Sequence, residues 1–282
     1  MGKKSLICQI SDELKSRYTS GNTKYGGEFG IDTTSTLRNY IKSCTQFGGW
    51  CRANYGAKTI DECRQYIEKY FKERENLAPD TRKKDAAALR KLYKTKDIGN
   101  IDTGSRSREN RTNNRGEKVR DKHFSESGKY ANFVTWERGT GTRAYKETAQ
   151  IKGSDIYTKN GNAFVHVEHG KGDRQREVPV LPQYKDFVLK IKEMAGDNKI
   201  LPYLTSGRNK VPEGSNAHQY RHEYAQALYD MHKRPYEQIP RGEKYICRKD
   251  RAGVVLDRAA LKIVTEALGH DRENEPPESY LT

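Results

Sequence analysis

The sequence lacks several features that mark large classes of proteins. Its five cysteines form no CxxC pair and no spacing with histidine that is typical of zinc sites, which argues against a disulfide framework and a zinc centre. No apolar run approaches about 18 residues, and no signal peptide opens the chain. We therefore expect a cytoplasmic protein that does not enter a membrane and needs no metal or other cofactor.

Acidic residues are fewer than basic ones: the sequence has 38 Asp and Glu and 53 Lys and Arg, which gives a net charge of +15. A surplus of this size favours a polyanionic partner, most often nucleic acid, although an ordinary basic protein would show the same balance. A chain of 282 residues fits two domains of ~100–200 residues each better than one. Its 18 Tyr and 7 Phe supply enough bulk for two modest cores.

The first 96 residues have the periodicity of a small helical bundle. Apolar side chains recur at steps of three and four. The helices that this pattern predicts lie at about 6–18, 32–51, 59–71 and 77–94. Cys44, Cys51 and Cys63 share the core spacing and are expected to pack as small apolar residues.

Residues 97–122 contain almost no apolar side chains and many Arg, Asn, Ser and Gly, which predicts a basic linker. It could be a solvated tether or a strap along phosphates, and the sequence does not decide between the two.

Residues 123–282 change to a mixed pattern. The stretch 154–182 alternates at period two and has turn signals at Asn160-Gly161 and at 170–173, so it predicts a three-stranded antiparallel meander. Helices are expected at about 128–151, 183–196, 216–233 and 256–269. The expected fold class is mainly α with a small antiparallel β-sheet.

The helix expected at 216–233 carries an unusual set of polar side chains. In "SNAHQYRHEYAQALY", His218, Arg221 and His222 fall within an arc of roughly 100°, with Tyr220 and Tyr224 on the other side. We predict that the tyrosine face packs and that the other face is presented. Taken alone, the polar face is explained as well by solvated charges and one structural histidine.

Other motifs stand in order around this helix. "GTGTRAYKETAQIKGSDI" carries Arg143, "HGKGDRQREVPV" carries Lys171 at a hairpin tip, and "EALGHDRENEPPESYLT" carries His270 and Tyr280. The order Arg, hairpin Lys, His-x-x-Arg, Leu-Gly-His and late Tyr resembles the tyrosine recombinase (phage integrase) family over about residues 30–282. Integrases of conjugative transposons and related mobile elements are the nearest in character. "LRNYIKSCTQFGGWC" and "LAPDTRKKDAAALRKLYK" look like the family's core-binding domain.

The resemblance implies a two-domain clamp around double-stranded DNA: a helical core-binding domain (1–96), a basic linker (97–122) and an α+β catalytic domain (123–282). The implied activity is site-specific DNA cleavage and rejoining without metal or ATP, which integrates or excises a mobile element. A homotetramer on synapsed DNA, formed from a chain that is monomeric in solution, is the implied assembly.

The resemblance also assigns roles to residues. Tyr280 is the nucleophile that forms a 3′-phosphotyrosine, and Lys171 is the general acid. Arg143 and Arg221 clamp the phosphate, because a planar guanidinium binds two oxygens at once. Hydrogen bonds come from His218 and His270, one of which helps to deprotonate Tyr280.

Four neighbouring residues receive lesser roles. Glu147 orients its neighbours and His222 is structural, while Arg174 and Arg176 either contact the DNA backbone or are solvated.

The chain departs from the family pattern in several places. The step from Arg143 to Glu147 is one residue longer than usual, and Tyr280 lies one residue further past His270 than in many members. Pro276-Pro277 is expected to interrupt the helix that presents Tyr280. Two residues follow Tyr280, which leaves its delivery in cis or in trans open, and the short N-terminal stretch favours a simple core-site recombinase over an arm-binding integrase.

Two alternatives remain open. A type IB topoisomerase-like enzyme would use the same residues to relax a single duplex, and a DNA-binding regulator would keep the fold without catalysis. An RNA-binding protein ranks last, because no aromatic-rich motif for stacking single strands is present.

Overall fold

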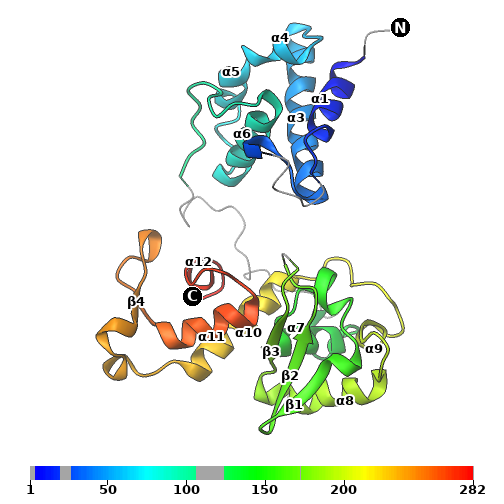
Figure 1. Ribbon diagram of the computed structural model, residues 1–282, viewed down its shortest axis with the longest axis vertical. Coiled ribbons are helices and arrows are strands. Elements are labelled where there is room, and N and C mark those ends of the chain that lie inside the picture. Colours follow the sequence, from blue (N-terminus) through cyan, green and yellow to red (C-terminus); the bar gives the residue numbers. More distant parts are fainter. Residues whose placement is uncertain (1–3, 20–26, 106–123, 172, 282) are drawn as a thin grey trace. The chain divides into compact units, whose positions relative to one another are not determined.

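The computed structural model describes residues 4–19, 27–105, 124–171 and 173–281. The chain divides into two compact units, Met1–Asn113 and Asn114–Thr282 (Figure 1). The boundary between them and most of the predicted linker, 106–122, lie outside the described residues. Among the described residues, no helix is long and apolar enough to cross a membrane.

The first unit is helical, as its periodicity predicts. Its elements are α1 (Leu6–Lys15), the 3-10 helix η1 (Gly27–Phe29), α3 (Thr34–Tyr55), α4 (Ile60–Arg64), α5 (Ile67–Lys72) and α6 (Pro79–Tyr93). Helix α3 packs against α1 and α6 around a core that includes the buried Cys44, Cys51 and Cys63, which confirms their predicted role. The single helix predicted at 59–71 is wrong, because the chain turns at 65–66 and separates α4 from α5.

The second unit is mainly helical with two small antiparallel sheets. Its helices are α7 (Ala131–Thr140), the π-helical turn η3 (Ala144–Thr148), η4 (Gly153–Asp155), η5 (Pro182–Tyr184), α8 (Lys185–Ala195), α9 (Leu201–Leu204), α10 (Ala217–His232), η6 (Tyr236–Gln238), η7 (Arg241–Glu243), η8 (Lys249–Arg251), α11 (Arg258–Leu268) and α12 (Glu275–Ser279). Its strands are β1 (Ile156–Lys159), β2 (Asn162–Val167), β3 (Arg176–Pro179), β4 (Lys244–Ile246) and β5 (Val255–Asp257).

The first sheet confirms the predicted meander, with strand order β1-β2-β3. Asn160 and Gly161 both have positive φ and close the β1–β2 turn, as the Asn-Gly signal predicts. The second sheet, β4 with β5, was not predicted from sequence. Each of its strands has three residues, which is too short to show a period of two.

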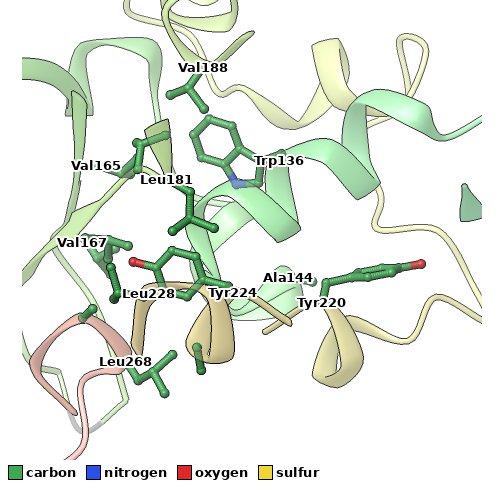
Figure 2. Packing of buried hydrophobic residues seen from close by; sticks show 14 of the residues in the cluster. Trp136, Ala144, Val165, Val167, Leu181, Val188, Tyr220, Tyr224, Leu228 and Leu268 are labelled. Atoms are coloured by element: carbon green, nitrogen blue, oxygen red, sulfur yellow. The ribbon is translucent and has the colours of Figure 1, made fainter. Parts of the chain in front are cut away.

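The core of the second unit joins helix α10 to the first sheet and to α7 (Figure 2). The Tyr224 hydroxyl donates to the Pro179 carbonyl at 2.7 Å and ties α10 to the end of β3. Gly141 follows α7 at φ 57°, where a Cβ atom would lie 2.2 Å from the Tyr224 ring. Only glycine allows the main chain to come this close to Tyr224. The contact places the segment that precedes Arg143 against α10.

Candidate active site

The tyrosine face of α10 packs as predicted, with Tyr220 and Tyr224 buried, and Arg221 on the polar face is also only 2% exposed. Its two terminal nitrogens donate to the main-chain carbonyls of Gly141 and Leu268. The rest of the predicted polar face is split between the exposed His218 and the half-buried His222. Main-chain oxygens from distant parts of the chain cover Arg221 on that side of the helix.

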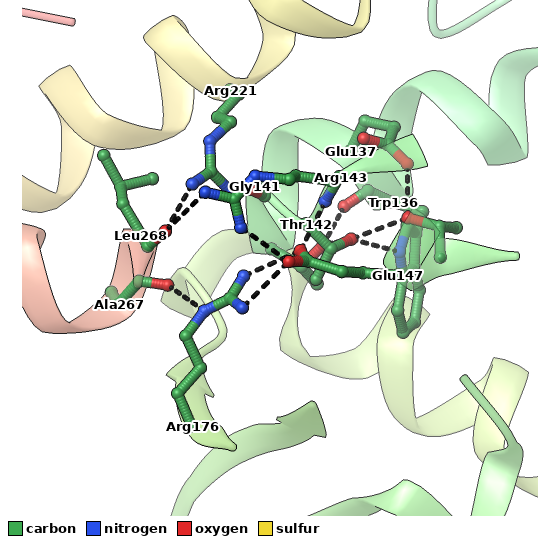
Figure 3. Close-up of polar contacts among 12 residues, drawn as sticks. Trp136, Glu137, Gly141, Thr142, Arg143, Glu147, Arg176, Arg221, Ala267 and Leu268 are labelled. Atoms are coloured by element: carbon green, nitrogen blue, oxygen red, sulfur yellow. Dashed lines mark hydrogen bonds and ion pairs between the residues drawn. The ribbon is translucent and has the colours of Figure 1, made fainter. Parts of the chain in front are cut away.

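Three arginines converge on the C-terminal end of α11 (Figure 3). Arg221 and Arg143 both donate to the Leu268 carbonyl, the latter at 3.3 Å, and Arg176 Nε donates to the Ala267 carbonyl at 2.8 Å. The last carbonyls of a helix have no partner within the helix and carry partial negative charge, so they attract cations. The end of α11 therefore fixes all three guanidinium groups.

Glu147 is the carboxylate at the centre of this cluster. It accepts from the Arg143 main-chain N–H at 2.7 Å, from Arg143 Nη1 at 2.6 Å and from Arg176 Nη1 and Nη2 at 3.0 and 2.7 Å. Burial by itself raises the pKa of Glu147, but hydrogen bonds and charge from Arg176 and Arg143 outweigh it and hold that pKa at about 2. Glu147 is thus ionised and orients two arginines.

The segment between Arg143 and Glu147 is a π-helical turn. The N–H groups of Thr148 and Ala149 bond to the carbonyls of Arg143 and Ala144, five residues back, at 3.2 Å each. A π turn holds one more residue than an α turn. Across this turn the Glu147 carboxylate reaches back to the Arg143 side chain.

Arg176 is the residue whose place the sequence analysis missed. Its side chain is 8% exposed and pairs with Glu147, so it is neither solvated nor available to the DNA backbone. The signal was present in strand β3, because the alternation that puts Val178 inside also puts Arg176 inside, two residues earlier. Gly269 leaves room for it, since a Cβ there would lie 3.0–3.3 Å from the Arg176 side chain.

Helix α12 brings Tyr280 to the cluster. The expectation that Pro276-Pro277 interrupts this helix is wrong: both prolines stand in its first turn, where no intrahelical N–H bond is lost. Tyr280 follows the helix and is 8% exposed. The Arg221 guanidinium carbon lies 5.6 Å from the centre of its ring, and the His270 ring lies 5.5 Å from it.

His270 is a buried neutral histidine beside Tyr280. Burial, together with the charges of Arg221, Arg143 and Lys171, lowers the pKa of His270 to about 4. Its Nδ1 lies 3.3 Å from the Glu275 carboxylate. In the described part of the chain, His270 Nε2 and Arg221 Nε are both buried without a hydrogen-bond partner.

The two remaining candidates are exposed. Lys171 lies in the β2–β3 connection between His169 and Asp173, whose side chains pair at 2.7 Å. His218 lies on α10 about one turn before Arg221. The structure therefore gathers Arg143, Arg221, His270 and Tyr280 in one cluster. Lys171 and His218 are exposed, and the charge of Lys171 acts on His270 in that cluster.

Comparison with known proteins gives resemblances in structure only. No family model matches the chain, and no curated protein matches it. XerH site-specific recombinase bound to palindromic difH substrate, a post-cleavage complex, is similar with a TM-score of 0.46 and 16% identity over 98% of this chain and 92% of that chain. The XerH pre-cleavage complex with difH substrate is similar with a TM-score of 0.42 and 17% identity, over 95% of this chain and 89% of that chain. XerA recombinase is similar with a TM-score of 0.34 and 13% identity, over 98% of this chain and 94% of that chain.

Proposed function

We propose that this protein is a site-specific recombinase that cleaves and rejoins DNA strands at Tyr280. One observation carries the proposal: among the residues that the structure describes, Arg221 Nε and His270 Nε2 are buried without hydrogen-bond partners beside Tyr280, in a cluster of three arginines and one ionised carboxylate. Buried polar atoms without partners are rare in proteins, and uncompensated guanidinium groups favour an anion. A phosphodiester next to a tyrosine hydroxyl meets both conditions.

The chemistry is a transesterification. The Tyr280 oxygen attacks phosphorus, a P–O(Tyr) bond forms, and the bond from phosphorus to the 5′-oxygen breaks. Arg143 and Arg221 stabilise the negative charge that builds on the non-bridging oxygens. The free 5′-hydroxyl of another strand reverses the step, so the bond energy is kept and no ATP is required. The guanidinium groups supply the positive charge that a metal would otherwise provide.

Proton transfers complete the cycle. His270 is neutral above a pH of about 4, so its imidazole can accept the Tyr280 proton or hold a phosphate oxygen, according to which ring nitrogen carries the hydrogen. His218, exposed on α10, donates a further hydrogen bond to the phosphate. Lys171 protonates the leaving 5′-oxygen from the hairpin tip.

The wider assembly follows from the same proposal. Residues 1–96 bind the core site, 97–122 form the basic linker, and 123–282 carry the catalytic residues. Two such units clamp the DNA, and four chains on two duplexes exchange strands to integrate or excise a mobile element. The positive net charge of the chain supplies the salt-sensitive backbone contacts.

A covalent-adduct assay tests the proposal. A duplex that carries the DNA flanking the protein's own gene is incubated with protein in EDTA, denatured in SDS and examined for a protein–DNA band. The band should form with wild type and with Tyr236→Phe, a tyrosine that is 55% exposed in the same unit, but not with Tyr280→Phe.

Other results of this assay would support one of the two alternative functions. Nicked duplexes that bind well but give no band would make the protein a DNA-binding regulator. A band at no fixed position, accompanied by relaxation of supercoiled DNA, would indicate a topoisomerase-like enzyme.

A further inference from the structure

A chain of buried polar side chains lies behind the arginine cluster and ends at Glu137, which is 0% exposed (Figure 3). Trp136 Nε1 donates to Thr142 Oγ1 at 3.1 Å, the Thr142 and Thr148 hydroxyls bond at 2.8 Å, and Thr148 Oγ1 donates to Glu137 Oε1 at 2.6 Å. Every bond in this chain is buried.

Glu137 receives too few hydrogen bonds for a buried carboxylate. In the described part of the chain, its Oε1 accepts one bond from Thr148 and its Oε2 has no partner. An ionised carboxylate has room for about four donors, and burial without them is costly. Burial raises the pKa of Glu137 to about 8, although the Thr148 hydrogen bond and Arg221 act in the opposite direction.

The charge state of Glu137 bears directly on the arginine cluster. Among the described residues, the charge of Arg221 on α10 lowers the pKa of Glu137 and the charge of Glu147 on the π turn raises it. With Glu137 protonated, Glu147 balances one of the three guanidinium charges and two remain uncompensated. When Glu137 ionises, one of those two is balanced as well, and the attraction of the cluster for an anion falls.

We propose that Glu137 acts on the arginine cluster through its charge and couples binding of the scissile phosphate to retention of a proton. The inference rests on the proposed function, because the anion is taken to be a DNA phosphodiester. Coupling between two binding equilibria is reciprocal. If ionised Glu137 weakens phosphate binding, then phosphate binding must draw a proton onto Glu137 whenever that carboxyl is partly ionised.

Calorimetry measures this proton directly. In a Tyr280→Phe background, which removes the heat of cleavage, the flanking duplex is titrated at about pH 8 in two buffers with different ionisation enthalpies. We expect uptake of a few tenths of a proton per bound chain at about pH 8 and little at about pH 6.5. Glu137→Gln keeps the shape without the titrating proton, so the uptake at about pH 8 should disappear.

Two outcomes separate the inference from the proposed function. If the duplex binds and Glu137→Gln takes up as many protons as the parent, the role of Glu137 is overturned while the proposed function stands. If no duplex binds at either pH, both are overturned.

Thr148→Val provides a second variant should Glu137→Gln fold poorly. It removes the donor to Glu137, which raises the pKa of that carboxyl and should move the uptake to higher pH. Uptake at an unchanged pH in Thr148→Val would also overturn the role.

Discussion

Arg143 and Arg221 donate hydrogen bonds to the same main-chain oxygen, that of Leu268 at the end of α11. His270 follows this helix end two residues later, and its main-chain N–H bonds back to the Thr265 carbonyl at 3.0 Å. The C-terminus of α11 therefore sets the spacing of both arginines and the histidine. Changes that disturb this helix end should affect the candidate site as a unit.

Arg221→Lys should lower the rate of adduct formation by about 10²–10³, because one ammonium cannot reproduce the planar fork that meets two carbonyls and a phosphate. Duplex affinity should fall much less, since contacts elsewhere dominate it. Timed SDS-gel assays and filter binding measure the two quantities. Arg241→Lys makes the same exchange at an exposed site and should change neither. Wild-type cleavage by Arg221→Lys would remove Arg221 from the site.

Arg176→Leu should destabilise the second unit by about 3–5 kcal/mol, because it leaves the buried Glu147 carboxylate with only Arg143 as a charged partner. Urea unfolding gives the free-energy difference. Arg174→Leu, two residues away, breaks an exposed pair with Asp271 and should cost no more than about 1 kcal/mol. Equal losses in the two variants would contradict a structural role specific to Arg176.

Arg176 and Arg221 differ in whether their burial could be predicted from the sequence. Side-chain periodicity predicted the meander and the helices at 183–196, 216–233 and 256–269. It did not predict the break at 141–143, which divides the helix expected at 128–151 into α7 and the π turn. Alternation along β3 could have predicted the burial of Arg176. The burial of Arg221 could not be predicted, because its partners are the main-chain oxygens of Gly141 and Leu268. Every residue has a main-chain oxygen, so the sequence does not indicate which ones accept a hydrogen bond from a distant side chain. The hydrogen bond from Thr148 to Glu137 likewise joins two helices through the tertiary fold.

Glu147→Gln should make stability less sensitive to acid. The pKa of Glu147 is lowered to about 2 in the folded protein, so its contribution is present above the ordinary carboxyl pKa of about 4.3 and is lost as pH falls through about 2. At neutral pH, ionised Glu147 contributes about 3 kcal/mol to the free energy of unfolding. Urea unfolding at a series of pH values should show wild type and variant converging as the solution becomes acidic. Glu266→Gln, on the exposed side of α11, should remain parallel to wild type. A constant gap between wild type and Glu147→Gln would refute the linkage.

Lys171→Ala should slow cleavage of ordinary DNA by about 10²–10⁴, the contribution typical of a general acid. The proposed role is proton delivery to the 5′-oxygen, which is a poor leaving group until it is protonated. A substrate with sulfur in place of that bridging oxygen removes the need, because a thiol has a pKa of about 8.5 and leaves as the thiolate. On the sulfur substrate, Lys171→Ala should therefore cleave within roughly tenfold of wild type.

Two control variants are compared with Lys171→Ala on the oxygen and sulfur substrates. Tyr280→Phe should be inactive on both substrates, since the nucleophile is absent whatever the leaving group. Arg143→Ala should be slow on both, because it weakens the stabilisation of the non-bridging oxygens, which sulfur at the bridging position does not replace. If Lys171→Ala is slowed equally on both substrates, then Lys171 holds the DNA backbone and the 5′-oxygen takes its proton from another group.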